Sequence, residues 1–148
     1  MPKSKPLMTN LSGQDTNAAV QSALRTLDVE SSGIIAVAAA LQADLGVAFA
    51  RTADLIGNAK GRLIVTWLGK SGHIGRKIAA TFASTGTPAF FVHAAEAGHG
   101  DLGMITADDV IMAMSWSGEQ PEMKNLITYA KRFRIPLIAM TADPESTL

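Results

Sequence analysis

Lys70 and Ser71 stand between two glycines, after an apolar run and before a helical pattern. Glycines let the backbone approach an anion, the start of a helix offers free N–H groups, and the ammonium and hydroxyl groups add donors. We therefore interpret the turn at 69–72, Gly72 included, as a candidate phosphate site. The glycine spacing fits neither a Walker P-loop nor a dinucleotide fingerprint, so an ordinary tight turn remains the alternative.

A second turn, at 115–119, places Ser115 and Ser117 on either side of a single residue. Two hydroxyls with this spacing can donate to the same anion, and the side-chain amide of Gln120 can donate as well. The alternative is a serine turn with a helix N-cap, which serines commonly provide. The presence of two such turns at strand ends favours a shared phosphate cradle.

His93, Glu96 and His99 are spaced three residues apart, which is compatible with a metal site. Gly98 and Gly100 favour a loop instead, and the chain has no cysteine to complete a zinc site, so we expect no metal. A loop histidine beside a phosphate site is better interpreted as an acid–base group, which makes His99 a candidate, or as a plain polar contact.

Glu122 falls in the first turn of a predicted helix. Its carboxylate either favours the helix dipole or faces the candidate phosphate site. Asp101, Asp108 and Asp109 are expected to be solvated turn residues.

The elements that must position these residues alternate between two hydrophobic periods. Short apolar runs predict strands, and helical periodicity separates them, which is the pattern of a three-layer α/β/α parallel sheet. The strands are expected at 63–68, 89–92, 110–114 and 136–140, and the helices at 74–84 and 122–133. Ligands of such sheets bind beyond the carboxyl ends of the strands, so the turns at 69–72 and 115–120 belong to one edge.

The N-terminal third predicts helices that precede the sheet. A helical pattern runs from Asp15 to Leu45, with a possible break at 31–33, where two serines and a glycine disfavour helix. A second helix is expected at 47–58, and a loop at 93–103.

The composition excludes several classes of function. The 148-residue chain has no net formal charge, which argues against a general nucleic-acid binder. It has no cysteine, which excludes thiol catalysis and disulfides. No apolar stretch reaches the roughly 18 residues of a membrane span, and the N-terminus does not resemble a signal peptide. We expect a cytoplasmic protein with no membrane or nucleic-acid partner, although a hydrophobic fraction of 47% is high for so short a chain.

Three segments carry a resemblance to a known family: GKSGH at 69–73, HGDLGM at 99–104, and the Ser-x-Ser-Gly-Glu turn at 115–119. They closely resemble the sugar isomerase (SIS) domain of bacterial D-arabinose 5-phosphate isomerases, over about residues 17–148. The resemblance implies a flavodoxin-like SIS domain over 14–148. It also implies that residues 31–33 lie inside one long helix. Residues 1–13 are rich in proline, lysine, serine and threonine, which predicts a flexible tail before the domain.

The resemblance further implies an isomerase that interconverts D-arabinose 5-phosphate and D-ribulose 5-phosphate through an enediol, on the route to the Kdo sugar of lipopolysaccharide. That reaction needs acid–base groups and oxyanion stabilisation, and no cofactor. Family members are tetramers, so a homo-oligomer that binds a sugar phosphate is expected. The family's active-site positions correspond to Lys70, His99 and Glu122, and its phosphate contacts to Ser71, Ser115 and Ser117.

The chain also departs from the family pattern. Trp67 stands where a small residue is usual, Trp116 replaces an asparagine, and Gln120-Pro121 replaces a hydroxyl residue. The family domain continues beyond Leu148, so we expect an incomplete domain whose last strand has an uncovered edge. Two alternatives stay open: a phosphosugar-binding module without catalysis, and a remnant that self-associates through its long N-terminal helices.

Overall fold

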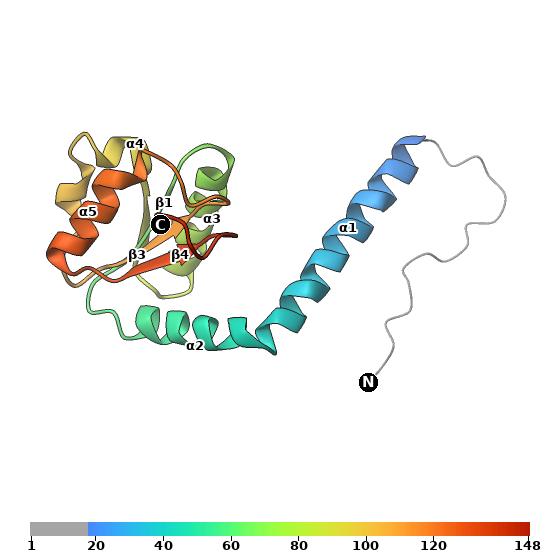
Figure 1. The fold of residues 1–148 in the computed structure, drawn as a ribbon, viewed down its shortest axis with the longest axis horizontal. Coiled ribbons are helices and arrows are strands. Elements are labelled where there is room, and N and C mark those ends of the chain that lie inside the picture. Colours follow the sequence, from blue (N-terminus) through green and yellow to red (C-terminus); the bar gives the residue numbers. More distant parts are fainter. Residues whose placement is uncertain (1–17) are drawn as a thin grey trace. The chain divides into compact units, whose positions relative to one another are not determined.

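The computed structural model in Figure 1 describes residues 18–148. The chain divides into two compact units, Met1–Val47 and Ala48–Leu148, and each is described by itself. The predicted tail at 1–13 and the predicted helix start at Asp15 lie outside the described residues.

The long helix of the first unit is α1, Ala18–Leu41, and it continues without interruption through the serines and glycine at 31–33. The break that their composition indicates is therefore wrong, and the single long helix is confirmed. Ser32 is accommodated because its Oγ donates to the Asp28 carbonyl oxygen one turn earlier, at 2.9 Å. Gly33 lies on an open part of the surface, where an added Cβ would meet nothing within 4 Å.

Helix α1 buries none of its side chains. Val29, Ile34 and Ile35 are among the most exposed apolar residues, at 71%, 72% and 60%. Within residues 18–148, no single helix has the length and apolar composition to cross a membrane; α1 and the next helix, α2 (Asp44–Gly57), pass such a test only together, as a bent pair, by length and composition alone.

The second unit contains a four-stranded parallel sheet in the order β2-β1-β3-β4. Its strands are β1 (Leu63–Trp67), β2 (Ala89–His93), β3 (Val110–Met114) and β4 (Leu137–Met140). The connecting helices are α3 (Gly69–Ser84), α4 (Ala94–Ala97), the short 3₁₀ helix η1 (Asp101–Met104) and α5 (Met123–Phe133). The predicted strands and parallel order are confirmed.

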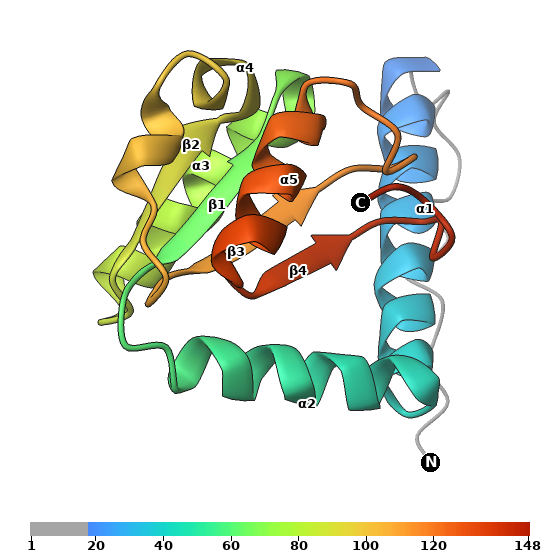
Figure 2. The same cartoon turned by 60° about the vertical axis from the view of Figure 1, so that its left-hand side comes forward.

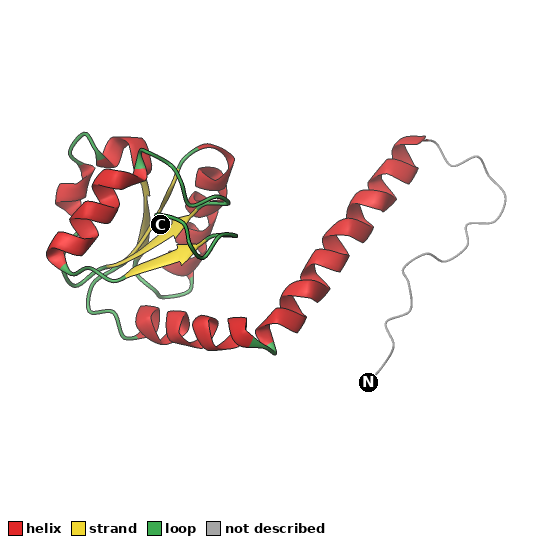
Figure 3. Cartoon of the chain, in the orientation of Figure 1, coloured by secondary structure: helices red, strands yellow, loops and turns green. Residues whose placement is uncertain are grey.

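The helices cover both faces of this sheet, as Figures 1, 2 and 3 show. Helix α3 packs on one face, and α4 and α5 lie on the other. Strands β1 and β3 are buried along their full length, which explains why both are nearly continuous apolar runs. The predicted three-layer α/β/α class is confirmed, and β4 is an edge strand in which Ala139 and Met140 are exposed.

Close packing fixes α3 on the sheet. A Cβ added to Gly75 would lie 3.0 Å from Cε2 of Phe91 and 3.3 Å from Cγ1 of Val65. The absence of a side chain at Gly75 therefore lets the helix approach the strands. Helix α3 begins at Gly69 and not near residue 74, so the predicted turn at 69–72 is the first turn of the helix itself.

The segment 93–103, which we predicted as a loop, contains α4 and η1. Its glycines suggest an open loop, but Ala94 and Ala97 are buried at 1% and 2% exposure. The burial of these alanines adds to the high helix propensity of residues 94–97, and together they favour a helical turn before the glycines.

Asp109 is not the solvated turn residue that the sequence suggests. Its side chain is 1% exposed, and it accepts hydrogen bonds from the Arg62 side chain and from the backbone N–H groups of Arg62 and Thr106. The sequence does not indicate this burial because Arg62, which neutralises Asp109, lies 47 residues away in sequence and next to Asp109 in space.

Candidate active site

The carboxyl ends of β1 and β3 lie side by side, because Thr66 of β1 is in register with Ala113 of β3. From β1 the chain crosses through α3 to β2 on one side, and it then returns to place β3 on the other side. The strand order therefore switches between β1 and β3. Crevices at such switch points are where open α/β sheets bind ligands, so the two predicted turns flank the expected position.

The turn after β1 presents Lys70 and Ser71 at the start of α3. Gly69 adopts a left-handed conformation, with φ of 58°, immediately after the strand. The Lys70 side chain is exposed and Ser71 is half-buried. Gly72 is buried, and its N–H donates to the Leu68 carbonyl oxygen at 3.1 Å, so this amide already has an acceptor.

The loop after β3 is held by its own two serines. The buried Oγ of Ser115 accepts from the N–H of Gly118 at 2.8 Å, and Ser117 Oγ accepts from the N–H of Glu119 at 3.3 Å. These are the bonds of the serine turn that we gave as the alternative. A hydroxyl that accepts still has a proton to donate, so the serine turn and a phosphate contact are compatible at both positions.

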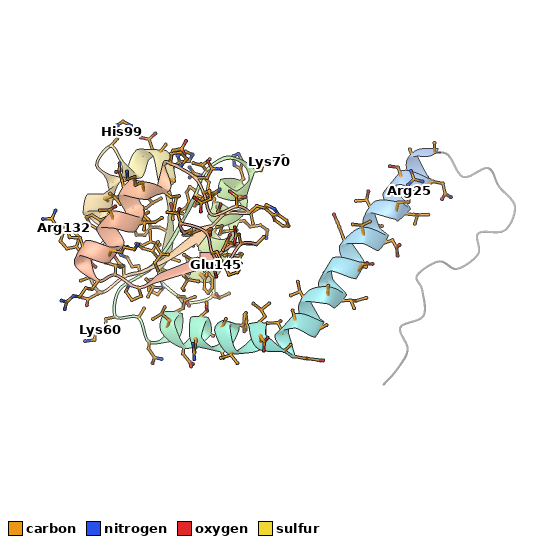
Figure 4. The ribbon with its side chains drawn as sticks, in the orientation of Figure 1. Arg25, Lys60, Lys70, His99, Arg132 and Glu145 are labelled. Atoms are coloured by element: carbon orange, nitrogen blue, oxygen red, sulfur yellow. The ribbon has the colours of Figure 1, made fainter. Side chains whose placement is uncertain are left out.

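The other two candidate catalytic residues flank the N-terminal end of α5. Glu122 is exposed at the residue that precedes the helix. His99 is exposed after α4, and the neighbouring Gly98 lies close to α5, where its Cβ would be 3.3 Å from Nδ2 of Asn125. Figure 4 shows His99 and Lys70 at the end of the sheet opposite Lys60.

The electrostatics of this edge come from helix ends and not from ion pairs. Helices α3 and α5 both begin there, and each contributes a partial positive charge from its free N–H groups. Lys70 adds a full charge. Among residues 18–148 the ion pair is Arg62 with Asp109, at the opposite edge, and no cluster of three His, Asp or Glu side chains there is arranged to hold a metal.

Two tryptophans differ sharply in their surroundings. Trp116, between the two serines, is 86% exposed, whereas Trp67 at the end of β1 is 5% exposed. Trp67 thus belongs to the core, and its carbonyl oxygen would be 3.3 Å from a Cβ on Gly72. Gln120 is exposed at the far end of the same loop.

Two buried polar atoms at this edge have no hydrogen-bond partner within the described part of the chain: Oγ1 of Thr66 and Nδ1 of His93. His93 ends β2, pairs in register with Trp67, and meets Phe91 edge-on at 6.4 Å between ring centroids. No sequence motif for phosphate binding predicts that these two atoms lack a partner.

A further group of residues at this edge was not predicted. The segment 141–148, after β4, lies along the loop after β3. The carboxylate of Glu119 accepts from the backbone N–H and from the hydroxyl of Thr147. These two bonds lower the pKa of Glu119 below its usual range. The sequence gives no signal for this contact, because the two residues lie 28 positions apart.

Comparison with known proteins identifies a family and several proteins that are similar to this chain. Residues 55–148 match the SIS domain model. The chain is 50% identical over 129 residues to arabinose 5-phosphate isomerase KdsD of Pseudomonas aeruginosa, covering 87% of this chain and 38% of that protein. It is 62% identical over 89 residues to KdsD of Escherichia coli O157:H7, covering 60% and 27% respectively. The chain thus spans well under half the length of these curated relatives.

A solved structure agrees with both. The protein c3406 of E. coli CFT073, in complex with arabinose 5-phosphate, superposes with a TM-score of 0.75 at 38% identity, over 90% of this chain and 70% of that one. The parallel sheet, the switch point between β1 and β3 and these similarities lead to one assignment: the chain belongs to the SIS domain family.

Proposed function

We propose that this chain provides the phosphate cradle and part of the acid–base machinery of an aldose–ketose isomerase that interconverts D-arabinose 5-phosphate and D-ribulose 5-phosphate. The observation that supports it best is the position of two serine-bearing segments at one switch point. One is the first turn of α3, which follows β1 and carries Ser71, and the other is the loop after β3, which carries Ser115 and Ser117.

In the proposed site, the phosphate is held by hydroxyl donors and by the positive ends of α3 and α5. Ser71, Ser115 and Ser117 donate to its oxygens, the amide of Gln120 adds a donor at the rim, and Gly72 keeps the backbone close. Helix α3 has 16 residues and α5 has 11, which is enough for each to present a helix-end field.

The isomerisation moves a proton between C1 and C2 of the sugar through an enediol. We assign proton transfer to His99, which is exposed on the segment beside α5. Lys70 stabilises the oxyanion that develops as the proton leaves carbon, because an ammonium group is a charged donor. Glu122 orients or polarises the sugar from the start of α5. Each proton that leaves carbon returns to the neighbouring carbon, so no oxidant or cofactor is consumed.

A second function, a phosphosugar-binding module without catalysis, is favoured by one observation. Lys70, His99 and Glu122 are all exposed, and their side chains make no hydrogen bond or ion pair with any other residue of 18–148. Catalytic groups need positioned partners to work at full rate.

Turnover by the 148-residue chain separates the two functions. We would add D-arabinose 5-phosphate and follow the appearance of the ketose, with His99→Ala and Glu122→Gln as variants that retain the cradle. Ketose formation that both variants reduce supports the isomerase. Binding of D-arabinose 5-phosphate in a thermal-shift titration, with no ketose formed, supports the module.

We further infer that the protein acts in the cytoplasm, as a homo-oligomer, on the route to the Kdo sugar of lipopolysaccharide. The self-association is supported by the exposed apolar side chains of α1, Val29, Ile34 and Ile35 among them. Sedimentation velocity of the purified chain tests this inference, and a monomer at all concentrations would refute it.

A further inference from the structure

The loop after β3 is hydrogen-bonded to the end of β4 and to the segment 141–148 that follows it. Ser115 donates its N–H to the Met140 carbonyl oxygen at 2.9 Å, and the Trp116 carbonyl oxygen accepts from the N–H of Ala142 at 3.1 Å and from Oγ1 of Thr141 at 3.2 Å. Further along, Leu148 donates its N–H to the Gly118 carbonyl oxygen at 3.2 Å. The two strands of chain thus run together beyond the sheet.

Gly118 is the point of closest approach. Its φ is 70°, a left-handed conformation, and a Cβ added there would lie 2.3 Å from Cβ of Ser146. A side chain at this position is therefore excluded both by the backbone and by the neighbouring segment. The segment 141–148 forms the back wall of the loop that carries Ser115 and Ser117.

Glu119 closes the contact from the loop side. Its two carboxylate oxygens accept separately, one from the backbone N–H of Thr147 and the other from Oγ1 of Thr147 at 2.7 Å. Two charge-assisted bonds to one residue fix both the distance and the orientation of the two segments. Thr147 is itself held in a turn, in which Ser146 Oγ donates to the Asp143 carbonyl oxygen at 2.8 Å.

We propose that Glu119 and Thr147 form a clamp that positions the loop 115–118 for binding a phosphate group. This inference rests on the proposed function. Glu119 is a positioning residue: its carboxylate is committed to Thr147, and its negative charge would repel a phosphate if it turned toward the ligand. The clamp keeps this charge away from the anion while it orders the serines that donate to it.

The test compares four variants of the 148-residue chain. Glu119→Ala removes both bonds, and Thr147→Val removes the hydroxyl but keeps the backbone N–H. Glu119→Gln should partly rescue the contact, because its amide oxygen can accept from the N–H and its NH₂ group can donate to the hydroxyl. Glu145→Ala is the matched control, since Glu145 is exposed in the same segment (Figure 4) and its carboxylate contacts no described residue.

Two readouts are measured. Hydrogen–deuterium exchange of the backbone amides at 115–119 reports on the order of the loop, because the N–H groups of Ser115, Gly118 and Glu119 are hydrogen-bonded. The dissociation constant for inorganic phosphate, measured by calorimetry, reports on the cradle. We expect faster exchange in Glu119→Ala and Thr147→Val, and in Glu119→Ala a dissociation constant about fivefold higher, with Glu119→Gln intermediate and Glu145→Ala unchanged.

A pH series tests whether the charged carboxylate of Glu119 holds the loop. The amides at 115–119 should exchange more slowly in wild type than in Glu119→Gln at neutral pH, and this difference should disappear as Glu119 is protonated at acid pH. Exchange that is the same in wild type, Glu119→Ala and Thr147→Val would overturn the clamp. Faster exchange with an unchanged dissociation constant would also overturn its positioning role. If the wild-type chain does not bind phosphate, the proposed function fails, whereas the exchange rates still decide whether Glu119 holds the loop.

Discussion

Arg62 and Asp109 join the start of β1 to the residue before β3 at the amino edge of the sheet. The Arg62 Nη2 and Asp109 Oδ2 atoms are 2.9 Å apart, and the backbone N–H of Arg62 donates to Asp109 Oδ1 at 2.7 Å. The same guanidinium donates to the Met104 carbonyl oxygen at 2.7 Å. The Arg62–Asp109 pair thus holds the two central strands and the end of η1 together, away from the candidate active site.

Replacing this carboxylate should destabilise the fold without touching the site. Asp109→Asn loses the charge and leaves buried donors of Arg62 and Thr106 with a weaker acceptor. The Arg62 side chain is 39% exposed, so solvent screens part of the attraction, and we expect the free energy of unfolding to fall by about 2 kcal/mol. Urea denaturation measures it. The neighbouring Asp108→Asn, with an exposed side chain, should change it by less than about 0.5 kcal/mol.

The same pair predicts a pH dependence of stability. Burial raises the pKa of Asp109, but the hydrogen bonds from Arg62 and Thr106 and the charge of Arg62 outweigh it and lower the pKa to about 2. In the unfolded chain an aspartate titrates near about 3.9. The contribution of the pair is therefore complete above about pH 4 and is lost as the pH falls toward 2. The difference in unfolding free energy between wild type and Asp109→Asn should shrink over that range, and a constant difference would contradict this assignment.

Substitution of two glycines in helices should change stability in opposite directions. Gly75→Val places a branched side chain against Phe91 and Val65, where a Cβ already lies 3.0 Å from the nearest ring atom, and should cost about 1–3 kcal/mol. Gly33→Ala adds a methyl group to an open helix surface and should increase helix stability by up to about 1 kcal/mol. Thermal denaturation followed by circular dichroism compares them. A stabilising Gly75→Val would show that α3 does not pack as closely as described.

Substitutions of Ser115 and Ser117 should distinguish an effect on stability from an effect on phosphate binding. Ser115→Ala removes the buried acceptor of the Gly118 N–H and should lower both stability, by about 1 kcal/mol, and phosphate affinity. Ser117→Ala changes an exposed residue and should weaken phosphate binding with little effect on stability. Thermal shift with and without D-arabinose 5-phosphate measures both quantities. If a variant that carries both Ser115→Ala and Ser117→Ala binds D-arabinose 5-phosphate as tightly as wild type, the phosphate lies elsewhere.

The exposed apolar surface of α1 predicts a change in assembly. Ile34→Glu and Ile35→Glu together put two charges on the surface that we expect to be covered by other copies, and should shift the protein to a smaller species in sedimentation velocity. The matched control is Glu30→Gln on the same helix, which should leave the assembly unchanged. An identical distribution of species for all three proteins would show that this surface is not the interface.

Local patterns were sufficient to predict most of the elements. The run Val110–Met114 is a strand in both prediction and structure, because five consecutive apolar residues suit a strand buried on both faces. The parallel direction of β1 and β3 places their carboxyl ends, and with them the predicted turns, at one edge, and the structure pairs Thr66 with Ala113 there. The predicted loop at 93–103 was wrong because Ala94 and Ala97 are buried, and this burial stabilises a helical turn in a glycine-rich segment.

By itself, the sequence determined the class of fold, the edge of the sheet to which the candidate turns belong and the residue types available for chemistry, since these depend on periodicity and on residues a few positions apart. Only the tertiary structure decided that Asp109 is buried against Arg62 and that Glu119 is held by Thr147. The first pair joins residues 47 positions apart in sequence, and the second joins residues 28 positions apart. An aspartate or glutamate in a turn has the same local signature whether water or a distant donor neutralises it. The fold alone supplies that donor, because it closes the long loops that bring the partners together.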